Sequence, residues 1–328
     1  MNLESPSVLC ARGAEAWNKE KASGNRLVLL HTLPALLLPL LVVVVNYFLD
    51  RELAGTGGIA GIGLRSSLET TQWVLSTAVQ VLLPFWEIGL LFVAMGISRN
   101  QHRDTDSLFE GFRRWGALLR MNLFRTLRYV VEILCGIFFG STIFMFTPFY
   151  DKLVGKLDLI AESPALENAT TEELYEALMA SLQPADMLPF CIFCVLAVAV
   201  LLIPVYYRYR MADYLLMDSD TPRAMSALRE SSFTMRGNCV ALFRLDLKFF
   251  WYYLLIALSL VAAYADLWLP ALGVALPFNE GIAALLAAIL QTVVLFIAYC
   301  LFRGRVETTY ACAYQSLMKE EERSESQC

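Results

Sequence analysis

Six apolar runs, each long enough to cross a lipid bilayer, constrain what this chain can fold into. They cover residues 26–47, 72–97, 127–149, 187–207, 247–269 and 282–302, and each contains 21 to 26 residues. Helices of that length measure roughly 31–39 Å, whereas the hydrocarbon core of a bilayer is roughly 30 Å thick. Hydrophobic residues make up 57% of the 328 positions, more than a soluble domain of this size can bury. The sequence therefore predicts an all-α polytopic membrane protein with six transmembrane helices.

Basic residues are unevenly distributed among the segments between these runs. Of the 26 Lys and Arg residues, 22 lie in residues 1–26, 98–128, 208–248 and 303–328. Because basic loops stay on the cytoplasmic side, we expect both termini to be cytoplasmic, with tails at residues 1–25 and 303–328. We accordingly predict a single integral-membrane domain, residues 1–328, located in the plasma membrane.

Two of the basic segments carry apolar stripes with helical spacing, which predicts two cytoplasmic amphipathic helices. The stripes consist of Leu108, Phe112, Trp115 and Leu119 in the first segment, and of Met225, Leu228 and Met235 in the second. Thr221 and Pro222 are suited to begin the second helix, and Gly237 is suited to end it.

The arginines of these two segments are candidate binding residues. We select Arg113, Arg114 and Arg229 as candidates for contact with anionic lipid headgroups at the cytoplasmic face. The alternative is that the same helices dock a soluble protein partner. Nucleic acid is not expected as a partner, because membrane topology already explains the basic stretches.

Two carboxylates, Glu87 and Glu132, lie inside predicted spans, where an ionised side chain is costly. If they lay close together in the inner half of the bilayer, they could share one proton, as a proton- or cation-coupled transporter requires. Alternatively, both serve structure. Glu132 can pair with Arg128 one helical turn away, and Glu87 can pair with Arg208 or accept hydrogen bonds from Tyr or Trp.

The sequence contains no His-Glu-x-x-His, Gly-x-Ser-x-Gly or Walker motif. Its two histidines are far apart, so we expect no His-rich metal site and no cofactor. We expect His31 to lie at the membrane interface with its hydrogen bonds satisfied. These features favour a protein that is not an enzyme, although an intramembrane enzyme using Glu87 or Glu132 stays open.

The C-terminal third contains a distinctive series of short patterns. They are the tyrosine-rich stretch 209–218 with Leu-Leu-Met-Asp218, then Met235-Arg-Gly237, Leu242-Phe243-Arg-Leu245, and a late Glu307-Thr-Thr-Tyr310. This series resembles the bacterial integral-membrane family catalogued as domain of unknown function 975. The resemblance extends over about residues 205–318, with an isolated Phe109-Glu-Gly-Phe112 before it. It implies a polytopic membrane topology and supplies no catalytic residue.

Two functional hypotheses follow from the sequence. The first is a membrane scaffold or accessory protein that acts through its basic helices. The second is a small-solute transporter that uses Glu87 and Glu132.

Overall fold

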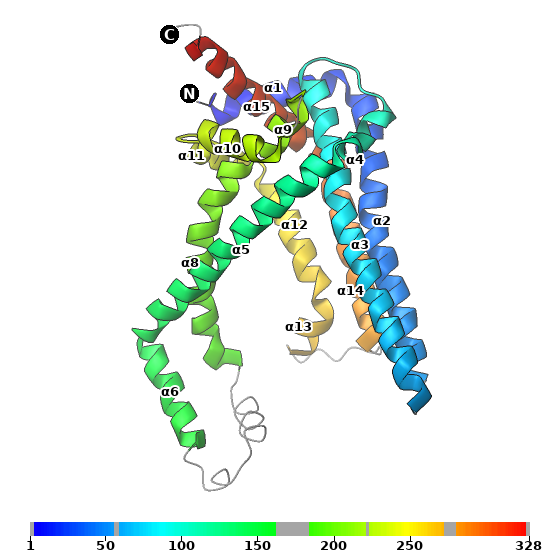
Figure 1. Ribbon diagram of the computed structural model, residues 1–328, viewed down its shortest axis with the longest axis vertical. Coiled ribbons are helices and arrows are strands. Elements are labelled where there is room, and N and C mark those ends of the chain that lie inside the picture. The colour runs from blue at the N-terminus through cyan, green and yellow to red at the C-terminus, as the bar shows by residue number, and fades with distance from the viewer. Residues whose placement is uncertain (1–2, 56–58, 162–183, 221–222, 272–279, 326–328) are drawn as a thin grey trace. The chain divides into compact units, whose positions relative to one another are not determined.

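The computed structural model describes residues 3–55, 59–161, 184–220, 223–271 and 280–325, and in these ranges all regular structure is helical (Figure 1). The elements, in chain order, are α1 (Pro6–Lys19), α2 (Lys21–Gly55), α3 (Ile59–Ser98), the 3₁₀ helix η1 (Thr105–Phe109), α4 (Glu110–Arg113), α5 (Trp115–Met145), α6 (Pro148–Ala161), α8 (Pro184–Tyr209), α9 (Ala212–Asp218), α10 (Ala224–Thr234), α11 (Cys239–Lys248), α12 (Phe250–Ala263), α13 (Ala265–Ala271), α14 (Glu280–Ala298), the π-helical turn η3 (Tyr299–Arg303) and α15 (Gly304–Glu325).

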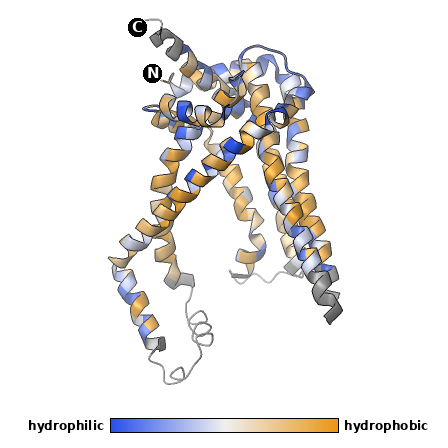
Figure 2. Ribbon diagram, viewed as in Figure 1, coloured by the Kyte–Doolittle hydropathy of each residue, from blue (hydrophilic) through white to orange (hydrophobic). Residues whose placement is uncertain are grey.

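Five helical segments within the described ranges are long and apolar enough to cross a membrane. They are Lys21–Leu49, Ser66–Ser98, Trp115–Met145, Met187–Asp218 and Gly281–Lys319. These segments coincide with all of the predicted runs except the fifth, and Figure 2 shows the hydrophobic colour that follows α2, α3, α8 and α14. The prediction of an all-helical chain compatible with a membrane is therefore confirmed.

The fifth predicted run, residues 247–269, is divided among three helices. The backbone leaves helical geometry at Phe249 and again at Tyr264, so α12 has only 14 residues, about 21 Å of helix. The axis of α11 makes an angle of 77° with that of α12. A sixth span is present only if such a bent pair of helices is counted as one span.

The chain divides into two compact units. Unit 1 consists of Met1–Leu119 and Met211–Cys328, and unit 2 consists of Arg120–Arg210. Each unit contributes helices of span length. The single membrane domain stays a prediction.

In unit 1, long helices pack side by side beneath a group of short ones. Helix α3 packs on α2, α2 on α14, and α14 on α12. At the end that carries both termini, α15 packs on α1 and α3, α1 packs on α11, and α9 packs on α10 (Figure 1). We call α1, α9, α10, α11 and α15 the end layer. The predicted tails, residues 1–25 and 303–328, thus contain helices α1 and α15 that pack on each other.

Unit 2 contains α6, α8 and most of α5. A β-carbon added at Gly136 or Gly140 would collide with the backbone of Val198 or Cys194, so α5 and α8 approach closely at these glycines. The spacing Gly136-x-x-x-Gly140 is typical of close helix contacts in membranes.

The two predicted amphipathic helices differ from the observed elements. The first is interrupted at Arg114, because η1 and α4 precede a separate helix α5 that starts at Trp115. The second corresponds to α10, which ends before Gly237, whose positive φ of 83° suits glycine. Its expected N-terminal residues, Thr221 and Pro222, lie outside the described residues.

Candidate functional site

Glu87 forms an ion pair with Arg303, which lies on the π-helical turn η3. This partner differs from Arg208, the arginine that the sequence suggests. The Arg303 side chain is 5% exposed and that of Glu87 is 39% exposed. Because an isolated buried charge is very costly, this pairing is what makes the burial of Arg303 tolerable.

The guanidinium of Arg303 also lies over an aromatic ring. Its Cζ is 4.2 Å from the centroid of the Tyr299 ring, a cation–π contact within one turn of η3. Its Nε and Nη1 atoms are buried and have no hydrogen-bond partner among the described residues. Single π-helical turns are frequent at functional sites, which makes η3 a feature of interest.

His31 and Trp86 connect α2 to α3 directly beside this pair. Their rings stack at 5.4 Å between centroids, and Trp86 Nε1 donates to the His31 carbonyl at 2.8 Å. His31 Nε2 lies 3.0 Å from the Trp86 carbonyl, which can only accept, so Nε2 is the protonated nitrogen. His31 is fully buried, and its Nδ1 has no partner among the described residues. The sequence predicts that both ring nitrogens of His31 are hydrogen-bonded. Among the described residues, only Nε2 has a partner.

We call the group formed by His31, Trp86, Glu87, Tyr299 and Arg303 the junction cluster. It draws on α2, α3 and η3, all in unit 1. Coulombic interaction between Arg303 and His31 makes them parts of one electrostatic site. The cluster thus has one formal ion pair, an aromatic frame and three nitrogen atoms without partners in the described chain.

Glu132 is in unit 2 and forms its ion pair within its own helix. Its Oε1 lies 2.5 Å from Arg128 Nη2, one helical turn earlier on α5. The Arg128 side chain is 51% exposed and that of Glu132 is 13% exposed. The pair agrees with the structural alternative for Glu132. Because Glu87 and Glu132 belong to different units, the hypothesis that they share a proton stays untested.

The three candidate arginines have different surroundings. Arg113 is exposed and pairs locally with Glu110, and Arg229 is exposed on α10. Arg114 also pairs with Glu110, through Nε at 3.3 Å, and in addition donates from Nη1 to the carbonyls of Leu216 and Ser219, at 3.1 and 2.7 Å. Those carbonyls belong to the C-terminal end of α9, where helix carbonyls lack intrahelical donors. Arg114 therefore stabilises the end of α9.

A hydrogen-bond network with two buried tyrosines, Tyr214 and Tyr314, links helices of the end layer. Tyr214 stacks on Tyr314 at 5.6 Å, and the Tyr314 hydroxyl donates to Asp218 Oδ2 at 2.9 Å. Arg99 donates to the same oxygen at 2.7 Å, and this hydrogen bond raises the pKa of the Arg99 guanidinium above its ordinary value. The network joins α9 and α15 to Arg99, the residue that directly follows α3, and these parts are distant in sequence.

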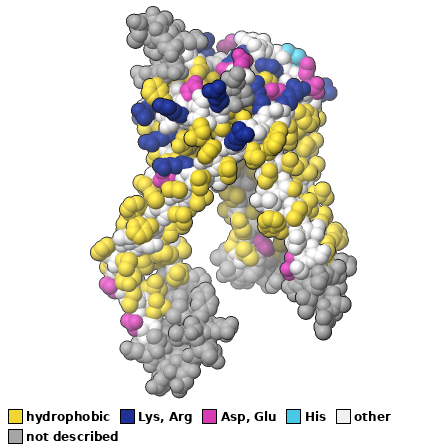
Figure 3. Space-filling view, viewed as in Figure 1, with side chains coloured by type: hydrophobic (Ala, Val, Ile, Leu, Met, Phe, Trp, Pro, Cys, Tyr) yellow, Lys and Arg dark blue, Asp and Glu magenta, His cyan; other side chains and the backbone are white. Residues whose placement is uncertain are grey.

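Helix α11 has one buried face and one solvent-exposed face. Leu242 and Leu245 are fully buried, which agrees with the packing of α11 on α1. On the other face Val240, Phe243 and Leu247 are exposed at helical spacing, and we call these three residues the α11 stripe. Arg244 and Lys248 are also exposed on this helix. In the space-filling view, Lys and Arg side chains gather over the end of unit 1 that carries the short helices (Figure 3).

Tyr214 and Asp218 of this network belong to the tyrosine-rich stretch 209–218, one of the sequence patterns that resemble a known family. Residues 19–321 match the family described as protein of unknown function (DUF975). The chain belongs to the DUF975 family. The match begins far upstream of the segment 205–318 on which the resemblance was based, so it covers the junction cluster as well. No curated protein and no solved structure matches this chain.

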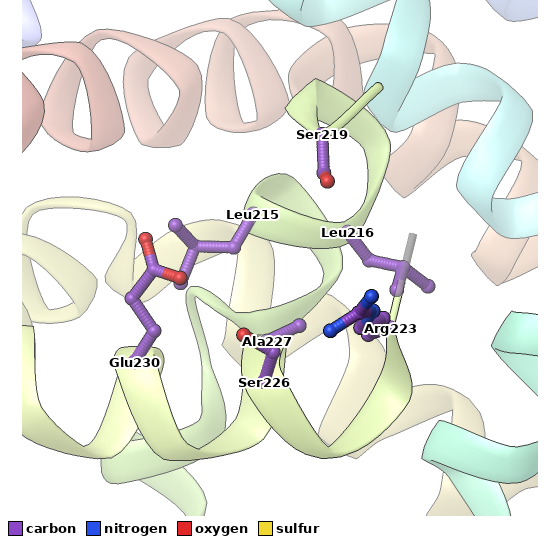
Figure 4. Close-up of a pocket in the computed structure, with 7 residues that line it drawn as sticks. All are labelled: Leu215, Leu216, Ser219, Arg223, Ser226, Ala227 and Glu230. Carbon is purple, nitrogen blue, oxygen red and sulfur yellow. The ribbon is translucent and has the colours of Figure 1, made fainter. Parts of the chain in front are cut away.

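This DUF975 member also has a pocket between α9 and α10, which sequence reasoning missed. Its cavity volume is about 280 Å³, and it is lined by Leu215, Leu216, Ser219, Arg223, Ser226, Ala227 and Glu230 (Figure 4). The figure shows Arg223 and Glu230 at opposite ends, with Ser219 on the α9 side and Ser226 on the α10 side. No motif marks these residues, because they come from two helices and a turn.

Arg303 was missed for a different reason. It follows the sixth apolar run directly, so it was counted as one of the basic residues that set the topology. The signal that could have identified it is its position at the end of an apolar run, where an arginine can turn inward to a carboxylate such as Glu87.

Proposed function

We propose that this protein is a non-enzymatic scaffold or accessory protein of the cell membrane, with both termini on the cytoplasmic side. In this proposal the end layer lies against the cytoplasmic leaflet, and its basic helices bind anionic headgroups. The observation that carries the proposal is the solvent-exposed α11 stripe on a helix that turns by 77° from α12.

The geometry of α11 is that of a helix lying in a membrane interface. If α12 runs along the membrane normal, α11 lies close to the membrane plane. Phe243 and its two stripe neighbours can then enter the boundary of the acyl chains, while Arg244 and Lys248 reach the headgroups. Each basic residue near an anionic surface contributes about 1 kcal/mol. Exposed Arg113 and Arg229 would add to this charge, whereas Arg114 serves the fold.

The ion pairs of the two intramembrane carboxylates support an accessory role over coupled transport. Both Glu87 and Glu132 face an arginine in the structure, as expected of residues that maintain architecture. A carboxylate that carries a coupling ion must exchange its partner during each cycle.

Coupled transport is the second candidate function, and one observation favours it. Arg303 Nε, Arg303 Nη1 and His31 Nδ1 are buried without partners among the described residues. Such atoms are rare in folded proteins and often mark a functional site or bound water. A transporter would use them to receive an anionic or protonated solute beside Glu87.

Photo-crosslinking in native membranes tests the headgroup proposal. Benzoylphenylalanine would replace Phe243 on the stripe and, as a control, Gln101, an exposed polar residue between α3 and η1. We expect lipid adducts at position 243, enriched in anionic lipid, and few at position 101. The double change Arg244→Gln and Lys248→Gln should reduce the anionic adducts. Adducts to protein alone at position 243, or equal lipid labelling at both positions, would contradict the proposal.

A further inference from the structure

The α9–α10 pocket is lined by a cation and an anion, Arg223 and Glu230, whose side chains are both exposed. Arg223 and Glu230 have no ion-pair or hydrogen-bond partner for their side chains among the described residues. They lie seven positions apart on the same helix, about 10.5 Å along its axis, and both line the cavity. A cation at one end and an anion at the other fit a ligand that carries both charges.

The Arg223 end is built for an oxyanion with several acceptor oxygens. Arg223 is the N-cap residue of α10, and the first helical hydrogen bond there runs from Ala227 N to the Arg223 carbonyl at 3.1 Å. The N–H groups of the first turn, including that of Ser226, therefore have no intrahelical acceptor. Guanidinium, hydroxyl and free N–H groups together are the donors that phosphate prefers.

The Glu230 end is built for an ammonium. In Figure 4 the Glu230 carboxylate extends toward Leu215, across the cavity from Arg223. Between the two ends, Leu215, Leu216 and Ala227 supply apolar surface. A short hydrocarbon link between the two charges of a ligand would lie against that surface.

We propose that the α9–α10 pocket binds phosphoethanolamine, with the phosphate at Arg223 and Ser226 and the ammonium at Glu230. The α-carboxylate and α-ammonium of an amino acid are closer together than the two charges of phosphoethanolamine. An amino acid therefore fits the distance between Arg223 and Glu230 less well. A choline group has no N–H to donate to Glu230, so it binds more weakly. The ligand is either the headgroup of phosphatidylethanolamine or the free phosphoethanolamine molecule. The site is separate from the α11 stripe and does not depend on the proposed headgroup binding there.

Native mass spectrometry of the full chain in detergent tests the site. Short-chain phosphatidylethanolamine and phosphatidylcholine would be titrated separately against the wild type, Arg223→Ala and Glu230→Gln. Arg236→Ala is the matched control, since Arg236 is exposed just beyond the end of the same helix and outside the pocket. Circular dichroism would show that each variant is folded.

We expect one phosphatidylethanolamine to bind with about tenfold preference over phosphatidylcholine, because the charge-assisted hydrogen bond to Glu230 is lost with a choline group. Arg223→Ala and Glu230→Gln should each weaken binding about tenfold, and Arg236→Ala should leave it unchanged. Competition by free phosphoethanolamine at equal concentration identifies the free molecule as ligand, and its failure identifies the lipid; both support the site.

Three results would overturn the proposal. The first is equal binding of phosphatidylethanolamine and phosphatidylcholine by the wild type. The second is unchanged binding in both pocket variants, and the third is competition by serine as strong as that by phosphoethanolamine. None of them bears on crosslinking at the α11 stripe.

Discussion

The two carboxylates on the long apolar helices α3 and α5 reach an arginine by opposite routes. Glu132 binds Arg128 on its own helix, and the arginine is 51% exposed. Glu87 binds Arg303 on an element far away in sequence, and that arginine is 5% exposed. A local exposed pair adds little to stability, whereas a buried pair between elements is costly to break. The burial of the arginine, more than the position of the carboxylate, therefore decides how much each ion pair contributes to stability.

The largest expected effect is at Glu87. Glu87→Leu leaves the buried Arg303 guanidinium without its ion-pair partner, and should lower the free energy of unfolding by about 3–5 kcal/mol. Unfolding by denaturing detergent, followed by circular dichroism, measures this loss. Adding Arg303→Met should recover most of it, because the buried charge is removed as well. A Glu87→Leu protein as stable as the wild type would show that the buried Glu87–Arg303 pair is not needed for stability.

The same contrast recurs between neighbouring arginines. Arg114→Ala removes a pair with Glu110, as Arg113→Ala does, and also two hydrogen bonds to the end of α9, so it should cost about 1–2 kcal/mol. Arg113→Ala removes an exposed pair with Glu110 and should cost about 0.5 kcal/mol or less. Hydrogen exchange of α9 distinguishes the two, since only Arg114→Ala should speed exchange there. Equal exchange in both variants would count against a capping role for Arg114.

The hydrogen bond from Trp86 gives an intermediate case. Trp86→Phe keeps an aromatic ring against His31 but removes the donor to the His31 carbonyl, which should cost about 1 kcal/mol. Trp73→Phe is the matched control, because Trp73 is largely exposed on the same helix α3 and should be near neutral. The thermal midpoint of each variant measures the difference. A loss for Trp86→Phe no larger than that for Trp73→Phe would show that the hydrogen bond from Trp86 contributes little to stability.

The smallest effect is expected at Glu132. Glu132→Leu leaves Arg128 exposed, where it can be solvated, and should cost less than about 1 kcal/mol. The measurement is the same detergent unfolding used for Glu87→Leu, which makes the two values directly comparable. A loss as large as that of Glu87→Leu would show that Arg128 is buried once the protein is in a membrane.

Sequence reasoning located the long apolar helices because hydrophobic length is a local property. It failed for the fifth run, where the chain breaks at Phe249 and Tyr264 without a proline or glycine to signal it. It identified the Glu132–Arg128 pair, since residues four apart share a helix face. It did not identify Arg303 as the partner of Glu87, because packing between distant helices decides that contact. The pocket between α9 and α10 was missed for the same reason.

The central claim is that Glu87 is an ionised, paired and structural carboxylate. Carbodiimide labelling of native membranes near neutral pH, read by mass spectrometry, tests it most directly, because the reagent modifies protonated carboxyl groups in apolar surroundings. If Glu87 is paired with Arg303, we expect no modification of Glu87 in the wild type. We expect clear modification in Arg303→Met, where the carboxylate has lost its ion-pair partner. Modification of Glu87 in the wild type to the same extent as in Arg303→Met would contradict the account and favour a coupled transporter.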